Sequence, residues 1–397
     1  MCKGNNNRII ENRKFITMKK LKIGVVGIGN MGLVHVKNIS ELSNCQLNAV
    51  CDIEPEAFAR IQSSLAAQIA HFTDYEQFLT KAPIDAVLIA TTHYDHPTMA
   101  IAAMKYGKHI IVEKPIAVHK QEAERLINAA AEFPDLVKCA MFNQRTIPAH
   151  RKIKQLIDTG ELGDIRRINW IITDWFRSQL YYDSGDWRAS WRGEGGGVLL
   201  NQCPHQLDLM QWFFGMPEKV RAAAKFGKYH DIEVEDEVNA YLEYANGATG
   251  NFIASTGEAP GTNRLEITAE RGRLVFEHGK MEFLRNEIPT SEFCRNTPLK
   301  FSIPDYWQVE IPAAATNQNQ HRDIVENFAN AILHGEKLIA PLEEGIRGLE
   351  LGNAMLLSGL TGHEVALPVN SIEYAARLEE LIADSRYRKI KVPEIAS

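Results

Sequence analysis

The stretch from Lys22 to Gly32 joins an apolar run to three glycines, and this combination limits the possible folds of the chain more than any other feature. Gly27, Gly29 and Gly32 follow the run in the order Gly-x-Gly-x-x-Gly. The first glycine suits a tight turn, the second leaves room for a pyrophosphate, and the third lets the next helix pack closely on the strand. The stretch therefore predicts a strand, a phosphate-binding turn and a helix.

The helix after this turn should begin with its positive end beside the phosphate. Its first residues, Asn30 and Met31, offer free N–H groups and are predicted to contact the cofactor together with the glycines. Apolar residues at helical spacing are expected to form one face of the helix, namely Met31, Val34, Ile39 and Leu42.

A carboxylate follows the second predicted strand, Leu47 to Cys51. Asp52 stands where a carboxylate binds both ribose hydroxyls of an adenosine. It would repel a 2′-phosphate, and the next arginine is Arg60, so NAD is favoured over NADP. The alternative is that Asp52 caps the helix that begins near Pro55.

Length and composition favour a two-domain globular chain. The 397 residues are 45% hydrophobic and 24% charged, which is more chain than one core usually sustains. A net charge of −6 argues against a nucleic-acid-binding surface. Residues 1–20 are polar and are expected to be an extension outside the fold. No apolar run reaches membrane length, so we expect no membrane partner and a cytoplasmic location. The six cysteines form no CxxC pair, which predicts reduced thiols and no metal.

Residues 21–145 alternate short apolar runs with helical periodicity, the pattern of a parallel sheet in an NAD-binding Rossmann domain. Ala86–Ala90 and His109–Val112 are predicted as its third and fourth strands. Residues just beyond strand ends face the ligand crevice of such a sheet. The cofactor contacts predicted there are Thr91, Thr92, His93, His96, Glu113 and Lys114. His93 and His96 resemble a metal pair, but no third ligand is evident, so a cofactor-edge or structural role is preferred.

Residues 146–397 are predicted to form a second domain for substrate binding and oligomerisation. Alternating apolar and polar residues indicate a large open, mostly antiparallel sheet, followed by helices over His321–His334, Glu344–Leu360 and Ser371–Ser385. Because the open face invites a second copy, a homodimer or homotetramer is expected.

The helix announced by the run Gly195 to Gly197 carries polar groups on one stripe. At 100° per residue, Asn201, His205, Asp208 and Trp212 share that stripe. Pro204 should kink this helix or mark its first turn. The glycine run should let another group approach, and the polar neighbours favour a functional role for His205 over a structural one.

Four features occur in one order along the chain: the glycine turn, Asp52, Glu113-Lys114-Pro115 and Asn201-x-x-x-His205. With these features the chain resembles the Gfo/Idh/MocA oxidoreductases, the glucose–fructose oxidoreductase and inositol dehydrogenase family. The resemblance covers Lys22 to Leu367. It implies a Rossmann domain, a C-terminal α/β domain with an open sheet, and a tightly held nicotinamide cofactor. It also implies that Lys114 and His205 act on a sugar or cyclitol hydroxyl. Many relatives carry Asp where this chain has Asn201, and an amide cannot replace a carboxylate as an ionic partner.

These residues suggest a chemistry. His205 would take the hydroxyl proton, Lys114 would stabilise the oxygen, and Asn201 would orient the hydroxyl. The aromatic stretch Trp175 to Trp191 would select the substrate, or would be a packed loop. Its predicted substrate contacts are Arg177, Tyr182, Trp187 and Arg188.

The expected function is NAD-dependent oxidation of a secondary hydroxyl on a sugar, sugar derivative or inositol. One alternative is transient oxidation by bound NAD, as in an epimerase, a glycoside-cleaving enzyme or a sugar–sugar oxidoreductase. The other is a non-catalytic ligand-sensing regulator. The presence of both Lys114 and His205 argues against the regulator.

Overall fold

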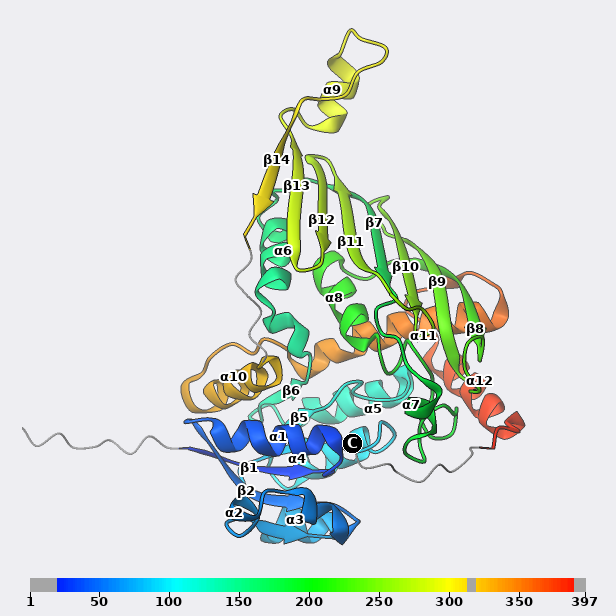
Figure 1. The fold of residues 1–397 in the computed structure, drawn as a ribbon. Coiled ribbons are helices and arrows are strands. Elements are labelled where there is room, and N and C mark those ends of the chain that lie inside the picture. Colours follow the sequence, from blue (N-terminus) through cyan, green and yellow to red (C-terminus); the bar gives the residue numbers. More distant parts are fainter. Residues whose placement is uncertain (1–19, 313–318, 389–397) are drawn as a thin grey trace, which may run out of the picture.

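The computed structural model describes residues 20–312 and 319–388, so all but the last residue of the predicted extension 1–20 lies outside the described residues. Two sheets, joined and covered by helices, make up the described chain (Figure 1). The predicted α/β architecture is confirmed. None of the helices in these ranges is both long and apolar enough to cross a bilayer.

The first sheet is parallel, six-stranded and ordered β3-β2-β1-β4-β5-β6. Its strands are β1 (Leu21–Val26), β2 (Cys45–Cys51), β3 (Ala70–Phe72), β4 (Ala86–Ile89), β5 (His109–Val112) and β6 (Lys138–Ala140). The intervening helices are α1 (Asn30–Glu41), α2 (Ser63–Ala66), α3 (Tyr75–Lys81), α4 (His96–Lys105) and α5 (Lys120–Ala131), with a 3-10 helix over Pro55–Arg60. The strand at His109 is the fifth, not the fourth, because β3 is too short to show a period.

The predicted face of α1 is only half right. Its buried residues include Gly32, His35 and Ile39, whereas Met31 and Val34 are exposed. A Cβ added at Gly32 would lie 1.8 Å from the Gly27 carbonyl oxygen. The helix therefore turns its glycine side toward the turn, which rotates Met31 and Val34 outward.

The second sheet has nine strands in the order β14-β13-β12-β11-β7-β10-β9-β8-β15. Their bounds are β7 (Ile165–Ile172), β8 (Lys219–Phe226), β9 (Glu235–Glu243), β10 (Thr249–Ser255), β11 (Asn263–Ala269), β12 (Gly272–Glu277), β13 (Lys280–Asn286), β14 (Tyr306–Ile311) and β15 (Val365–Ala366). Only β7 and β10 pair in parallel; the other ladders between these strands are antiparallel. Ile168, Trp170 and Ile172 point to the buried face of β7.

Helices α6 (Pro148–Asp158), α8 (Pro204–Phe214) and α11 (Gly345–Thr361) lie along one face of this sheet, and the other face is open in the view of Figure 1. The remaining helices are α7 (Gln179–Asp183), α9 (Thr290–Asn296), α10 (Gln320–His334) and α12 (Ser371–Asp384), with 3-10 turns over Asn143–Thr146 and Leu342–Glu344. The predicted helices after residue 320 are confirmed within one or two residues.

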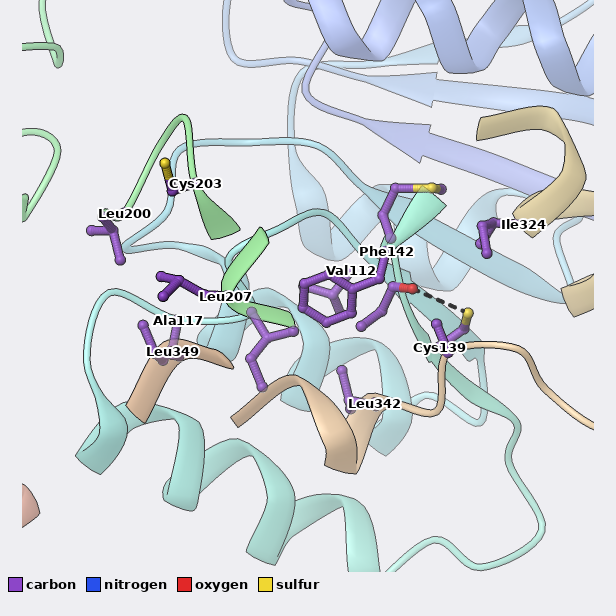
Figure 2. Packing of buried hydrophobic residues seen from close by; sticks show 14 of the residues in the cluster. Val112, Ala117, Cys139, Phe142, Leu200, Cys203, Leu207, Ile324, Leu342 and Leu349 are labelled. Carbon is purple, nitrogen blue, oxygen red and sulfur yellow. Dashed lines mark hydrogen bonds between the residues drawn. The ribbon is translucent and has the colours of Figure 1, made fainter. Parts of the chain in front are cut away.

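The C-terminal part of the chain returns to the first sheet. Asn44 Nδ2 on the first half donates to Asn330 Oδ1 of α10 at 2.8 Å, and the N–H of Ala140 donates to the carbonyl of Ala340 at 3.0 Å. Figure 2 shows the buried side chains where the two halves meet, among them Val112 of β5 and Leu207 of α8. The two sheets thus share a continuous apolar core at this junction.

Candidate active site

The glycine turn fits a phosphate group. Gly27 has φ +86°, and an added Cβ would lie 2.6 Å from the Ala90 carbonyl oxygen. At Gly29, an added Cβ would meet no described atom within 4 Å, so the space above the turn is open. Within the described chain, the first turn of α1 carries no acidic side chain. The N–H groups of Asn30 and Met31 begin this helix, so its positive end can bind a pyrophosphate.

Asp52 lies beside this turn at the end of β2. Its Oδ2 accepts the N–H of Ile28 at 2.6 Å, and its Oδ1 accepts the N–H of Glu54 at 3.0 Å. Arg60 also reaches the turn, where its Nη2 donates to Asn30 Oδ1 at 2.6 Å. The sequence did not indicate that Arg60 lies at the turn, because Arg60 is separated from Asp52 along the chain.

Glu113 holds the backbone of the Glu-Lys-Pro segment. One oxygen is 2.6 Å from His35 Nε2, and the other accepts the N–H of Lys114 at 3.0 Å. Burial raises the pKa of Glu113, but the hydrogen bond with His35 and the positive charges of His35, His321 and Lys114 together more than offset this and lower it to about 2. These contacts argue against the cofactor contact predicted for the Glu113 side chain.

Lys114 crosses from the first half of the chain to the second. Its Nζ donates to the carbonyl oxygen of Asn201 at 2.9 Å. Burial lowers the pKa of Lys114, while the negative charges of Glu113 and Glu194 raise it.

Helix α8 begins at Pro204, so the proline occupies the first turn and causes no kink. Asn201 lies in the turn before the helix, and its predicted place on the helical stripe is wrong. His205 is in the first turn and is buried, and its Nδ1 has no hydrogen-bond partner within the described residues. Burial and then the charge of Lys114 lower the pKa of His205 well below its usual range.

The glycine run before α8 accommodates protein, not a ligand. A Cβ at Gly195 would lie 2.2 Å from Val118 Cγ1, and one at Gly197 would lie 2.0 Å from the Glu235 carbonyl oxygen. The run therefore lets this loop close against the first domain and β9, which corrects the expectation that it opens a ligand approach.

Glu194 is a site residue that the sequence reasoning missed. Its buried carboxylate accepts hydrogen bonds from Asn201 Nδ2 and from the N–H of Ala189, the latter at 2.7 Å. The available signal was an acidic residue directly before a glycine run. His321, at the start of α10, was also missed; its ring lies 5.7 Å from that of His35. Nothing local in the sequence indicates this contact.

His96 has a structural position. Its Nδ1 is 2.8 Å from the Pro115 carbonyl oxygen and its Nε2 is 3.1 Å from that of Thr91, so the ring ties two strand ends together. This placement argues against the cofactor contact predicted for His96. Thr92 Oγ1 donates to Asp95 Oδ2 at 2.6 Å in the same loop.

His93 is buried between this loop and the aromatic stretch. Its Nδ1 is 3.4 Å from the carbonyl oxygen of Glu194, and its ring meets Trp187 edge-on at 5.1 Å. Within the described ranges, no three His, Cys, Asp or Glu side chains gather as a metal site requires. The described cysteines are free, and all except Cys294 are buried.

The aromatic stretch places two arginines beside the lysine. Arg177 and Arg188 lie over the ring of Tyr181 at 4.9 Å and 4.4 Å, and Arg188 lies 4.3 Å from the ring centre of Trp187. Both arginines lower the pKa of Lys114, behind the larger effect of burial. The predicted substrate contacts Arg177 and Arg188 therefore lie in the electrostatic neighbourhood of Lys114, and Trp187 packs against Arg188.

Tyr182 is the exception. It is fully buried, and its hydroxyl is 2.8 Å from Thr256 Oγ1. This placement argues against the predicted substrate contact, because the side chain packs beneath the loop and its hydroxyl already has a partner.

Comparisons with known proteins identify the family of the chain. The family model described as "Oxidoreductase family, NAD-binding Rossmann fold" matches residues 21–140, and the model described as "GFO/IDH/MocA C-terminal domain" matches residues 150–275. The scyllo-inositol 2-dehydrogenase (NAD(+)) of Bacillus subtilis is 25% identical over 88% of this chain and 97% of its own. The levoglucosan dehydrogenase of Pseudarthrobacter phenanthrenivorans is 27% identical over 68% of this chain and 76% of its own.

A similar solved structure is the WlbA dehydrogenase from Bordetella pertussis in complex with NADH and UDP-GlcNAcA. It superposes with a TM-score of 0.74 and 25% identity, covering 89% of this chain and 100% of the other.

Proposed function

Because the chain belongs to the Gfo/Idh/MocA oxidoreductase family and carries its NAD-binding Rossmann domain, we propose that it is an NAD-dependent dehydrogenase acting on a secondary hydroxyl of a sugar, sugar derivative or inositol. The names of the inositol and levoglucosan dehydrogenases support this substrate class. The observation that carries the proposal is the contact between Lys114 Nζ and the carbonyl oxygen of Asn201, next to the start of α8 at which His205 lies.

His205 is the base of the proposed reaction. Its lowered pKa keeps the imidazole neutral at physiological pH, so that it can accept a proton. Since Nδ1 is enclosed, Nε2 is the nitrogen that takes the proton from the substrate hydroxyl. Bound NAD supplies the hydride acceptor.

Lys114 stabilises the substrate oxygen. An ammonium group has three N–H donors, and one of them is used by the Asn201 carbonyl. The others hold the hydroxyl oxygen and stabilise its negative charge as the proton leaves. Arg177 and Arg188 bind further hydroxyls, and the ring of Trp187 contacts the apolar face of the substrate.

The test uses Lys114→Ala and His205→Ala in the full chain. Both variants are expected to bind NADH as the unmodified protein does and to lose at least about a hundredfold in kcat, since each removes a group needed only for reaction. NADH binding is measured by fluorescence. Turnover is measured with a polyol that has first been identified by its thermal shift in the presence of NAD. Near-normal turnover in both variants would overturn the mechanism.

The same assay separates net from transient oxidation. A dehydrogenase releases free NADH, which absorbs in the near ultraviolet, in proportion to the polyol consumed. An epimerase or sugar–sugar oxidoreductase converts substrate without this accumulation. If substrate is consumed and no free NADH accumulates, the transient oxidation is the correct mechanism and net dehydrogenation is not.

We also propose that the protein forms a homodimer or homotetramer through the open face of the second sheet. Ile171, Tyr241 and Ile253 lie on that face, with polar neighbours such as Asn251 and Arg264. Multi-angle light scattering at micromolar concentration is the test, and a monomeric mass would contradict it.

A further inference from the structure

The carboxylate of Glu194 is 1% exposed and lies at the centre of a bent loop. Besides the hydrogen bond from Asn201 Nδ2, it accepts the N–H of Ala189, which adopts φ +67°. Residues other than glycine rarely enter this left-handed region. The N–H of Glu194 itself donates to the carbonyl of Ser190 at 2.8 Å, which closes the loop. The loop is thus folded around one buried negative group.

Glu194 determines which way the Asn201 amide points. An ionised carboxylate only accepts hydrogen bonds, so the amide must turn its NH₂ group toward Glu194 and its Oδ1 away from it. The carbonyl oxygen of the same Asn201 accepts the hydrogen bond from Lys114 Nζ. One residue therefore connects the buried carboxylate to the lysine.

The charges around Lys114 give Glu194 a second effect. Burial favours the neutral amine and lowers the pKa of Lys114, and the nearby Arg177 and Arg188 lower it further. Glu113 and Glu194 act in the opposite direction. After Glu113, Glu194 is therefore the second acidic group that favours the ammonium form.

We propose that Glu194 is a positioning residue of this enzyme: through its hydrogen bond with Asn201 it aims the Asn201 amide oxygen at the substrate hydroxyl, and through the same residue it places a buried carboxylate near Lys114. The inference rests on the proposed dehydrogenase function. Glu194 acts through Asn201 and Lys114, and it does not touch the substrate.

The first test is Glu194→Gln, which keeps the shape and removes the charge. We expect kcat to fall about tenfold or more with unchanged NADH binding, because the amide orientation is no longer fixed. The alkaline limb of the pH profile should move to lower pH, because a negative charge that favours the ammonium form of Lys114 is lost. Glu233→Gln is the matched control. Glu233 accepts the N–H of Trp191 in the same loop at 2.8 Å, and this variant should keep both kcat and the pH profile.

The second test exchanges the two groups. In the double variant Glu194→Gln with Asn201→Asp, the amide and the carboxylate trade places across the same hydrogen bond. It should recover kcat about fivefold or more over Glu194→Gln, because a carboxylate again stands beside Lys114. Asn201→Asp alone puts two carboxylates in contact and should lower activity. The inference is overturned if the double variant is no better than Glu194→Gln, or if Glu194→Gln changes thermal stability but not the pH profile.

A readout without turnover separates this inference from the proposed function. The rate at which acetic anhydride labels Lys114, followed by mass spectrometry across pH, reports the titration of its amine. Glu194→Gln should lower that apparent pKa, because the negative charge that raises it is removed. If the pKa shifts but the protein oxidises no polyol, the proposed dehydrogenase function is wrong, whereas the role of Glu194 toward Lys114 still holds. An unchanged titration in an active enzyme would disprove only the role of Glu194.

Discussion

Gly29 and Gly32 belong to the same turn, but a side chain would have different consequences at each. An added Cβ at Gly29 enters open space, whereas one at Gly32 collides with the Gly27 carbonyl oxygen. Gly29→Ala should therefore keep the thermal stability and weaken NADH binding about tenfold or more, because the methyl occupies the phosphate position. Gly32→Ala should lose about 2 kcal/mol or more of unfolding free energy. Calorimetry and NADH titration measure the two effects, and unchanged NADH binding by Gly29→Ala would place the pyrophosphate elsewhere.

We expect Asp52 and Arg60 together to set the choice between NAD and NADP. Asp52→Asn keeps the shape beside the Ile28 N–H and removes the charge that repels a 2′-phosphate. We expect NADH binding to weaken about tenfold and the NADPH to NADH affinity ratio to rise about tenfold or more. Arg60, which donates a hydrogen bond to Asn30 at the turn, is expected to bind the added phosphate.

The control for this prediction removes the arginine. In Asp52→Asn with Arg60→Ala, the gain for NADPH should disappear while the loss for NADH remains. If the single variant keeps its original preference for NADH, the ribose hydroxyls do not depend on the Asp52 charge. Titration of both reduced cofactors by fluorescence gives the ratio directly.

Sequence reasoning succeeds at residues whose roles depend on the local backbone. The spacing alone predicts a tight turn at Gly27 and close helix packing at Gly32, and in the structure a side chain at either position would collide with backbone atoms. Glu194 acts on Asn201 only because the loop folds back on itself, and the Glu113 partner His35 lies on another element. Such partners are fixed by tertiary packing, which periodicity does not contain.

At the scale of elements, the first turn of α8 shows the limit of a pattern. Pro204 was compatible with a kink or with a helix start, and the helical stripe from Asn201 assumed the longer helix. The structure begins the helix at Pro204, because a proline lacks the N–H that an interior position needs. The burial of Tyr182 was not predicted for a related reason: an aromatic-rich loop contains both packed and exposed rings, and composition does not distinguish them.

Helix α8 is held to the first half of the chain by a buried ion pair. Arg145, in the 3-10 turn after β6, donates from Nε and Nη2 to the carboxylate of Asp208 at 2.7 Å and 2.6 Å, and both side chains are 1% exposed. Asp208→Asn leaves the arginine without this charge and should cost about 3 kcal/mol or more. Glu380→Gln breaks the exposed pair with Arg377 and should cost at most about 0.5 kcal/mol. Denaturant unfolding compares them, and equal losses would contradict the buried role of Asp208.

For the whole molecule, the candidate site depends on both halves of the chain. Lys114 comes from the first sheet, and Asn201, 87 positions later, belongs to the second half. That Lys114 and His205 act on the same hydroxyl was expected from the family resemblance, because no spacing rule spans such a distance. The return of α10 to the first sheet was not expected, since a single boundary at residue 145 assigns that helix wholly to the second domain.

Several buried histidines make the folded molecule sensitive to acid. Burial lowers the pKa values of His93, His96, His150, His205 and His321. In the unfolded chain a histidine gains a proton below about pH 6.5, whereas these rings stay neutral in the fold. The unfolded state therefore binds more protons in this range. The unfolding free energy is highest above about pH 6.5 and falls as the pH drops toward the folded pKa values.

His150 offers a measurable share of this effect. Its ring packs between Phe213 and Phe276, and burial lowers its pKa to about 4. The pKa of this histidine is about 6.5 in the unfolded chain and about 4 in the fold. By proton linkage, His150 should therefore lower the unfolding free energy by about 2 kcal/mol at about pH 5 relative to about pH 7.5. In His150→Gln this difference should shrink by that amount, even if the variant is less stable at both pH values. His363→Gln, at an exposed position, is the control. Urea unfolding at the two pH values gives the comparison, and a His150→Gln protein with the full original pH dependence would show that His150 already binds its proton in the fold.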